Sequence, residues 1–208
     1  MSILAYNKKS TETEPIETGS YPARVYQMIQ IGTVAGFQGA LQNKVRIGFE
    51  LPTELAIFDP AKGEQPRVIS QDYTLSFHEK AKLTKVINAC DPNALKALDE
   101  DGFLEEFDVE NLIGKDCLIT IGQKAKKDGT GNYAFIDGCT RIPKGMTCPK
   151  AINPVQVLSF DKWNEEKFNA LPDFIKDKIT SSEEYKKMKG IVSDEDMKFN
   201  EFMGETTP

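Results

Sequence analysis

The fold is decided by residues 112–141, LIGKDCLITIGQKAKKDGTGNYAFIDGCTR. Two runs within it, Asp116–Gly122 and Tyr133–Cys139, are rich in apolar and β-branched residues, a composition typical of β-strands. Between them stands Asp128-Gly129-Thr130-Gly131, whose glycines tolerate the positive φ that a tight reversal needs. The stretch therefore predicts a β-hairpin, whose tip carries three cations: Lys124, Lys126 and Lys127.

The chain before this hairpin predicts three more strands. Apolar and polar residues alternate over Gly19–Ile31 and again over Lys44–Leu51, so we expect these two strands to pair across the glycine-rich connection 32–39. Prolines and a glycine predict a loop over residues 52–66. A third strand is expected at Val68–Phe77.

Short helices are predicted between the third and fourth strands. Apolar residues have helical spacing over His78–Ala89, and Asp108–Ile113 predicts a short helix with Asp108 as its N-cap and Gly114 just past its end. Three strands, helices and two strands are the element order of an OB-fold. The predicted fold class is mainly β with α: a five-stranded OB-fold Greek-key barrel with a helical insert between strands 3 and 4 and a C-terminal helical segment.

The sequence predicts four parts. Residues 1–18 are polar and contain Pro15, which is typical of a flexible arm, and residues 19–155 form the expected OB-fold domain. Residues 156–190 form a helical segment, because apolar residues recur at helical spacing after Asp161. Residues 191–208 are an acidic tail that we expect to be disordered alone.

The net charge of −6 conceals a basic region between two acidic ones. Residues 111–160 hold seven Lys or Arg and three Asp, a net charge of +4. Residues 91–110 hold eight acids and one Lys, a net charge of −7, and residues 161–208 hold twelve acids and eight Lys, a net charge of −4. Because the local distribution of charge decides what a surface attracts, the basic β-region remains a candidate for binding a polyanion.

The composition favours a cytoplasmic protein without a cofactor. No run approaches the roughly 18 apolar residues of a membrane helix, and the first residues lack the pattern of a signal peptide, so no membrane contact is expected. Cys117 and Cys139 lie in strand-like runs as small hydrophobic residues would, which agrees with a reducing compartment. There is no CxxC pair and His78 is the only histidine, so no metal site is expected.

A set of cations and aromatic residues forms the candidate binding site. The alternation places the polar residues of the first two strands on one sheet face, beside an aromatic ring, and this combination suits backbone attraction with base stacking. Taken alone, the lysines of the tip are more typical of a solvated turn, and single aromatic residues are more often buried. The candidate residues are Arg24, Tyr26, Phe37, Lys44, Arg46, Lys124, Lys126, Lys127 and Tyr133.

Enzymatic activity is not expected. The sequence contains no GxSxG, GxxxxGK[ST] or HExxH motif, and His78 at the end of a strand favours a structural role. A nuclease needs clustered carboxylates, whereas the strands offer only the dispersed Asp72, Asp116 and Asp137. Cleavage of DNA that depends on a divalent metal would support that alternative.

The acidic tail carries aromatic residues. Asp194, Glu195 and Asp196 precede Phe199 and Phe202. A tail of this kind can occupy a cationic groove when nucleic acid is absent and recruit partner proteins when it is displaced. A solvated terminus without a role is the plain alternative.

Four segments resemble a group of bacteriophage replication-associated proteins: YPARVYQMIQIGT (21–33), KVRIGFELP (44–52), ISQDYTLSFHEKAKL (69–83) and ENLIGKDCLITI (110–121). The group is similar to phage single-stranded DNA-binding proteins with an OB-fold. The resemblance implies protection of single-stranded DNA during phage replication or recombination in the host cytoplasm. It also implies that the acidic tail contacts phage or host replication proteins. The alternative is a protein-interaction or virion-assembly module.

Overall fold

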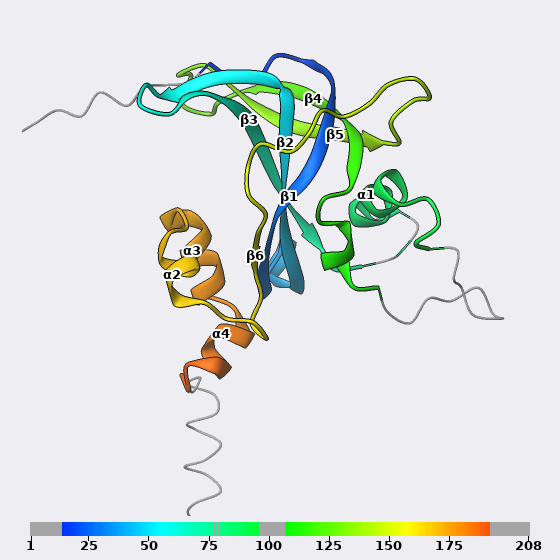
Figure 1. Ribbon diagram of the computed structural model, residues 1–208. Helices are drawn as coiled ribbons and strands as arrows, with labels where there is room; N and C mark the ends of the chain where they lie inside the picture. Colours follow the sequence, from blue (N-terminus) through cyan, green and yellow to red (C-terminus); the bar gives the residue numbers. More distant parts are fainter. Residues whose placement is uncertain (1–13, 77, 79, 96–106, 192–208) are drawn as a thin grey trace, which may run out of the picture.

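A curled antiparallel sheet lies at the centre of the protein (Figure 1). The computed structural model describes residues 14–76, 78, 80–95 and 107–191. The strand order is β3-β2-β1-β4-β5, which makes a five-stranded half-barrel compatible with an OB-like barrel. The strands are β1 Gly19–Ala35, β2 Leu41–Asp59, β3 Gly63–Thr74, β4 Asp116–Ala125, β5 Asn132–Thr140 and β6 Gln156–Leu158. The helices are α1 Lys82–Cys90, α2 Glu165–Asn169, α3 Asp173–Thr180 and α4 Glu183–Met188, with 3₁₀ turns η1 Phe37–Gly39 and η2 Val109–Leu112.

The hairpin that the sequence predicted is present. β4 and β5 pair from Leu118 with Thr140 to Ala125 with Asn132, and both glycines of the turn have positive φ. The short helix before it is η2, and the Asp108 carboxylate accepts a hydrogen bond from the backbone N–H of Glu110, as expected of an N-cap. The predicted pairing of the first two strands is also confirmed.

The loop predicted over residues 52–66 was wrong. β2 continues to Asp59 and β3 begins at Gly63, so the two strands extend as a long hairpin. Pro52 lies where the register shifts between Leu51 and Leu55. A proline is tolerated in a strand at such a bulge, because no ladder hydrogen bond is needed from its nitrogen.

The regular alternation predicted for the first strand was also wrong. Register shifts interrupt the pairing of β1 with β2 between Val25 and Gln27 and between Gln30 and Gly32. Each extra residue reverses the faces that follow it. Met28, which strict alternation with Arg24 and Tyr26 would place on the polar face, therefore lies in the core. The glycine connection predicted from residue 32 begins only after Ala35.

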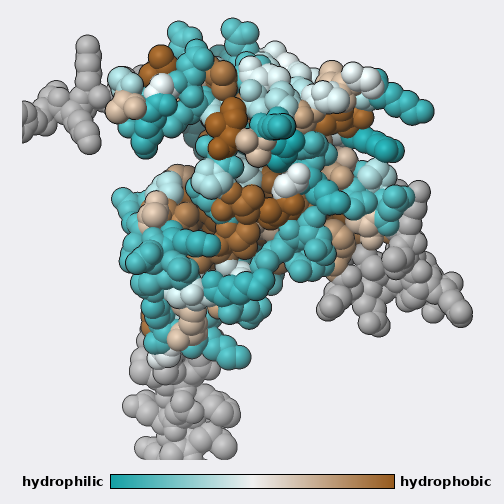
Figure 2. Space-filling model, in the orientation of Figure 1, coloured by the Kyte–Doolittle hydropathy of each residue, from teal (hydrophilic) through white to brown (hydrophobic). Residues whose placement is uncertain are grey.

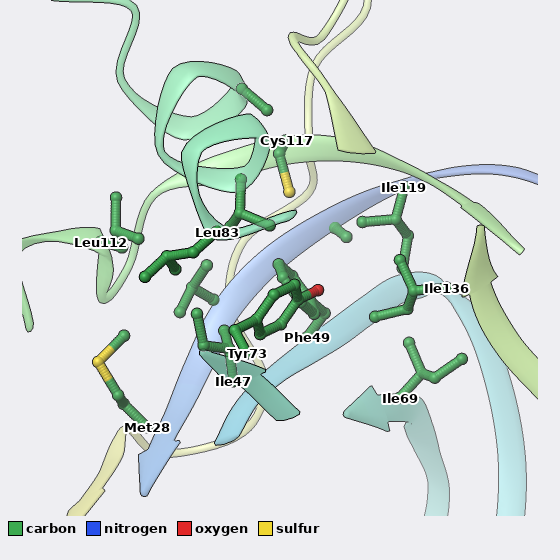
Figure 3. Close-up of a cluster of buried hydrophobic side chains, with 14 of the residues drawn as sticks. Met28, Ile47, Phe49, Ile69, Tyr73, Leu83, Leu112, Cys117, Ile119 and Ile136 are labelled. Carbon is green, nitrogen blue, oxygen red and sulfur yellow. The ribbon is translucent and has the colours of Figure 1, made fainter. Parts of the chain in front are cut away.

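The main hydrophobic core fills the concave side of the sheet. Figure 3 shows Leu83 of α1 and Leu112 of η2 pointing toward Phe49 and Ile47 of β2. Cys117 is buried in this core as a free thiol, as the sequence suggested. The end of the expected N-terminal arm is attached to the same core: Ile16 is buried, and its carbonyl oxygen accepts a hydrogen bond from Gln123 Nε2 (2.9 Å).

The C-terminal segment builds a second core against the far half of β1. β6 pairs in parallel with β1 beyond the part of β1 that pairs with β4, and α2, α3 and α4 follow it (Figure 1). Ile29 and Ile31 of β1 pack there against a group of apolar residues from this segment: Leu158, Phe168, Ile175 and Ile179. The single tryptophan, Trp163, packs against the same cluster.

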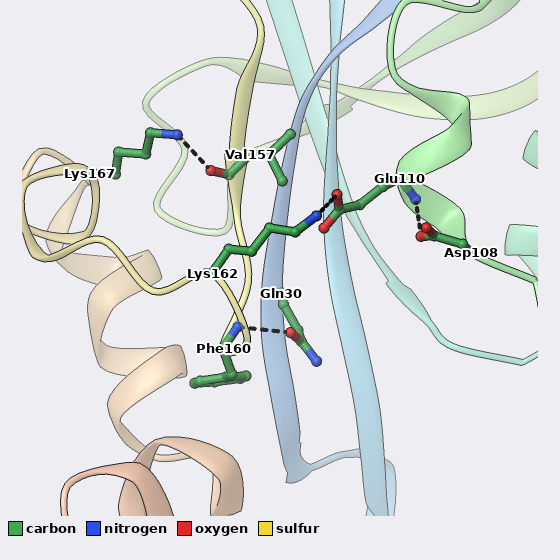
Figure 4. A network of polar contacts seen from close by, with 7 residues as sticks. All are labelled: Gln30, Asp108, Glu110, Val157, Phe160, Lys162 and Lys167. Carbon is green, nitrogen blue, oxygen red and sulfur yellow. Dashed lines mark hydrogen bonds and ion pairs between the residues drawn. The ribbon is translucent and has the colours of Figure 1, made fainter.

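Polar contacts hold this segment against the sheet. Figure 4 shows the backbone N–H of Phe160 donating to Gln30 Oε1 (3.1 Å) and Lys162 reaching Glu110 of η2 (3.0 Å). Farther along, Glu184 of α4 accepts from the backbone N–H of Thr33 (2.6 Å) and from its hydroxyl (2.7 Å). Burial alone raises the pKa of Glu184, but these two hydrogen bonds bring it below the ordinary value.

One buried carboxylate fixes the chain between β5 and β6. Glu50 of β2 is fully buried, and its Oε1 accepts hydrogen bonds from the backbone N–H groups of Ile152 (3.0 Å) and Asn153 (2.6 Å). Residues of this connection therefore cross the convex face of the sheet at Glu50. Within the described residues, no helix is long and apolar enough to span a membrane.

Candidate nucleic-acid interface

Four residues of the β4–β5 hairpin form an aromatic and cationic surface, which we call the hairpin patch: Gly122, Lys124, Tyr133 and Phe135. Lys124 pairs with Tyr133 and Gly122 with Phe135, so the four share the face that points away from the core. The Lys124 ammonium lies 4.4 Å from the centroid of the Phe135 ring, within the range of a cation–π contact. Tyr133 is 46% exposed. The patch offers an accessible ring beside a cation.

Gly122 makes the position of the Phe135 ring possible. A Cβ atom at residue 122 would lie 2.7 Å from Phe135 Cζ, closer than side chains approach one another. Phe135 was not among the sequence-predicted site residues. The sequence feature that points to Phe135 is Gly122 of β4, which pairs with Phe135 and lies two residues before Lys124.

The tip of the hairpin adds two more lysines and is locally ordered. Lys126 N–H donates to the carbonyl of Gly131 (2.8 Å), and the Asp128 carboxylate accepts from the backbone and hydroxyl of Thr130. The hydrogen bond from the Thr130 backbone N–H lowers the pKa of Asp128 most, and the bond from the Thr130 hydroxyl lowers it further. Lys127 is exposed. The sequence prediction that these cations share one hairpin tip is confirmed.

The predicted face of strands 1 and 2 is largely engaged by the protein itself. Arg24 forms a two-point ion pair with Asp116 across β1 and β4 (2.7 and 3.1 Å). Tyr26 is only 7% exposed, which leaves little ring surface for a base. Burial, followed by the nearby charge of Glu50, raises its pKa.

Arg46 shares one carboxylate with a lysine of the C-terminal segment. Its Nη1 lies 2.5 Å from Asp72 Oδ1 on β3, and Lys178 of α3 lies 2.5 Å from Asp72 Oδ2. Burial raises the pKa of Asp72, but the bonds and charges of Lys178 and Arg46 outweigh it and lower the pKa. Lys44, two residues before Arg46, is partly exposed on the same face of β2.

The structure does not bring all predicted residues together. Phe37 lies in η1 at the end of β1 that follows Ala35, and its side chain is outside the described part of the protein. The β4–β5 tip lies beyond the other end of β1, because Gly19 pairs with Ile121. The tail residues Asp194, Glu195, Asp196, Phe199 and Phe202 also fall outside the described residues.

A pocket of about 300 Å³ near β6 does not suit a polyanion. Its walls include Met28 and Val45, whereas its rim carries Asp108, Glu110 and Asp161 and, among the described residues, the single cation Lys162. This excess of carboxylates repels phosphate. In the described ranges, no three His, Cys, Asp or Glu side chains are grouped as metal ligands would be. His78 Nδ1 accepts a hydrogen bond from the Lys80 N–H (3.2 Å), a local turn contact.

A comparison of the chain with protein-family models finds no match, and a comparison with curated proteins finds none either.

Proposed function

We propose that this chain is a non-enzymatic OB-fold protein that binds and protects single-stranded DNA with little sequence preference. The process it serves is DNA replication or recombination of a bacteriophage, in the cytoplasm of the host. The hairpin patch carries this proposal, because it combines the exposed Tyr133 ring with Lys124 at the edge of a half-barrel. The strand order and the position of α1 between β3 and β4 support the OB assignment.

Stacking on aromatic rings and attraction of the phosphate backbone explain binding without sequence preference. Each base offers a π-face, so a stack on Tyr133 contributes about 1–3 kcal/mol whatever the base. Lys124 and the lysines of the tip attract phosphates, a contribution that weakens as salt rises. Asp128 lies in the same loop as these lysines, but its carboxylate accepts hydrogen bonds from Thr130.

Reversing two charges of the hairpin tests the site. The double substitution Lys124→Glu with Lys126→Glu is expected to weaken binding of a labelled oligo-dT of about 30 nucleotides. The dependence of log affinity on log salt should also flatten by about one unit for each phosphate that the hairpin no longer neutralises. Fluorescence anisotropy over a series of salt concentrations measures both quantities.

The matched control is Lys82→Glu with Lys85→Glu on α1, where both lysines are exposed. It changes the net charge equally but leaves the hairpin intact, so its salt dependence should stay close to that of the unaltered protein. Equal effects in the two double variants would mean that only net charge matters. An unchanged affinity and slope in the hairpin variant would remove the patch from the site.

The acidic tail is proposed to compete with DNA and to contact replication proteins. Ending the chain after Ile191 removes all five named tail residues: Asp194, Glu195, Asp196, Phe199 and Phe202. Without them the affinity for oligo-dT at low salt should rise several-fold, because the negative charges of the tail no longer compete with DNA for the cationic surface. The anisotropy titration gives the answer directly, and an affinity equal to that of the full chain would contradict competition by the tail.

A protein-interaction or virion-assembly module is the second candidate, and an apolar groove beside β6 favours it. The groove has a volume of about 280 Å³ and is lined by Ile29, Val155, Val157 and Leu171 among others. Figure 2 shows apolar side chains gathered in the middle of this face. Val155 is 56% exposed, as expected of a surface that a partner covers. Absence of salt-sensitive DNA binding would favour this candidate.

A further inference from the structure

The exposed ring of Phe174 is the observation that sequence reasoning did not anticipate. Phe174 lies at the start of α3 and is 53% exposed, although the neighbouring Ile175 is buried in the second core. Hydrophobic burial therefore does not explain where this ring lies. Its face instead contacts the Arg46 guanidinium, whose Cζ is 5.4 Å from the ring centroid.

α3 places Phe174 and a cation over the same part of the sheet. Phe174 and Lys178 are four residues apart, so they lie on one side of the helix, and Ile175 and Ile179 face the second core. Lys178 reaches Asp72 of β3 while Phe174 reaches Arg46 of β2. We call Lys44, Arg46, Phe174 and Lys178 the α3 platform.

The charge of the platform suits a nucleic-acid backbone. Asp72 is the carboxylate that Arg46 and Lys178 share, so these three groups retain one positive charge, and Lys44 adds another. Arg46 and Asp72 are both mostly buried, which fixes the guanidinium beneath the ring. A ring held in this way loses little conformational freedom when a base stacks on it.

We propose that the α3 platform is a second subsite for single-stranded nucleic acid, in which a base stacks on Phe174 and the backbone lies along Lys44 and Lys178. This inference rests on the proposed DNA-binding function. It assigns to the C-terminal segment the stacking role that was predicted for Tyr26, whose ring is buried. The segment then completes the binding surface that the half-barrel begins at the hairpin patch.

Single substitutions at position 174 test the subsite in the full chain. Phe174→Ala is expected to weaken binding of the 30-nucleotide oligo-dT by roughly 5- to 150-fold, the range for loss of one base–aromatic stack. Phe174→Trp, which retains a stacking ring, should bind at least as tightly as the unaltered protein. Met188→Ala on α4 is the control, because Met188 is also an exposed apolar residue of this segment.

A photocrosslink to the unaltered protein gives a readout that does not depend on how a variant folds. Oligonucleotides with 5-iododeoxyuridine should crosslink to the peptide containing residue 174 in the unaltered protein and, more strongly, in Phe174→Trp. If the unaltered chain binds DNA and the hairpin variant is impaired, but Phe174→Ala binds normally or the unaltered protein forms no crosslink at residue 174, the subsite is overturned and the proposed function stands. If the unaltered chain does not bind single-stranded DNA, both fail.

Discussion

Replacing Glu50 with alanine is expected to lower the free energy of unfolding by about 2–4 kcal/mol. The Glu50 carboxylate is fully buried and accepts the N–H groups of Ile152 and Asn153. Alanine leaves both donors without an acceptor, and hydrogen bonds to a charged group contribute about 1.5–3 kcal/mol each. The loss stays below their sum, because removing a buried charge also removes its desolvation cost.

Urea denaturation followed by circular dichroism measures this loss. Glu50→Gln is the matched control: its amide oxygen can accept the same two N–H groups, so we expect it to lose about 1 kcal/mol. Trypsin provides a local readout, because Lys144 and Lys150 lie in the connection that Glu50 fixes and should be cleaved faster in the alanine variant. Equal stability and equal cleavage in both variants would show that the carboxylate does not hold this connection.

The elements that could be predicted from the sequence were those determined by residues close together in the chain. Glycines at 129 and 131 determine the β4–β5 turn, and Asp108 caps η2 through its own local hydrogen bond. The extended β2–β3 hairpin was missed because Pro52 indicates a loop, and only pairing shows that it sits at a bulge. The bulges of β1 likewise have no signal in a pattern of period two.

The candidate site likewise has one part that the sequence predicts and another that it does not. Lys124 and Tyr133 come together because a hairpin of known turn fixes their pairing, which the sequence reveals. The contact between Arg46 and Phe174 depends on where the C-terminal segment docks, about 130 residues after Arg46 in the chain. Composition and spacing predict that this segment is helical, but not which sheet face it covers.

Gly32→Ala is expected to destabilise the docking of that segment, with a loss of about 3–4 kcal/mol. Gly32 has φ 86°, a conformation that costs an L-residue about 1–2 kcal/mol. A Cβ there would also lie 2.5 Å from Glu184 Oε2 and 2.9 Å from Phe160 and Ser182. Glu184 must then move from Thr33 and lose two hydrogen bonds, which at this partly exposed carboxylate contribute about 1 kcal/mol each. Urea denaturation followed by Trp163 fluorescence reports the change, since Trp163 packs within the segment.

Gly39→Ala separates the two causes. Gly39 has φ 80°, close to that of Gly32, but a Cβ at this position would meet no atom within 4 Å. It should therefore lose only the conformational part, about 1–2 kcal/mol, and leave Trp163 fluorescence unchanged. If the α3 platform binds DNA, Gly32→Ala should weaken binding to oligo-dT while Gly39→Ala does not. Equal stability losses in the two variants would mean that the close approach of Gly32 to α4 contributes nothing, and that the segment is held to the sheet by its apolar core alone.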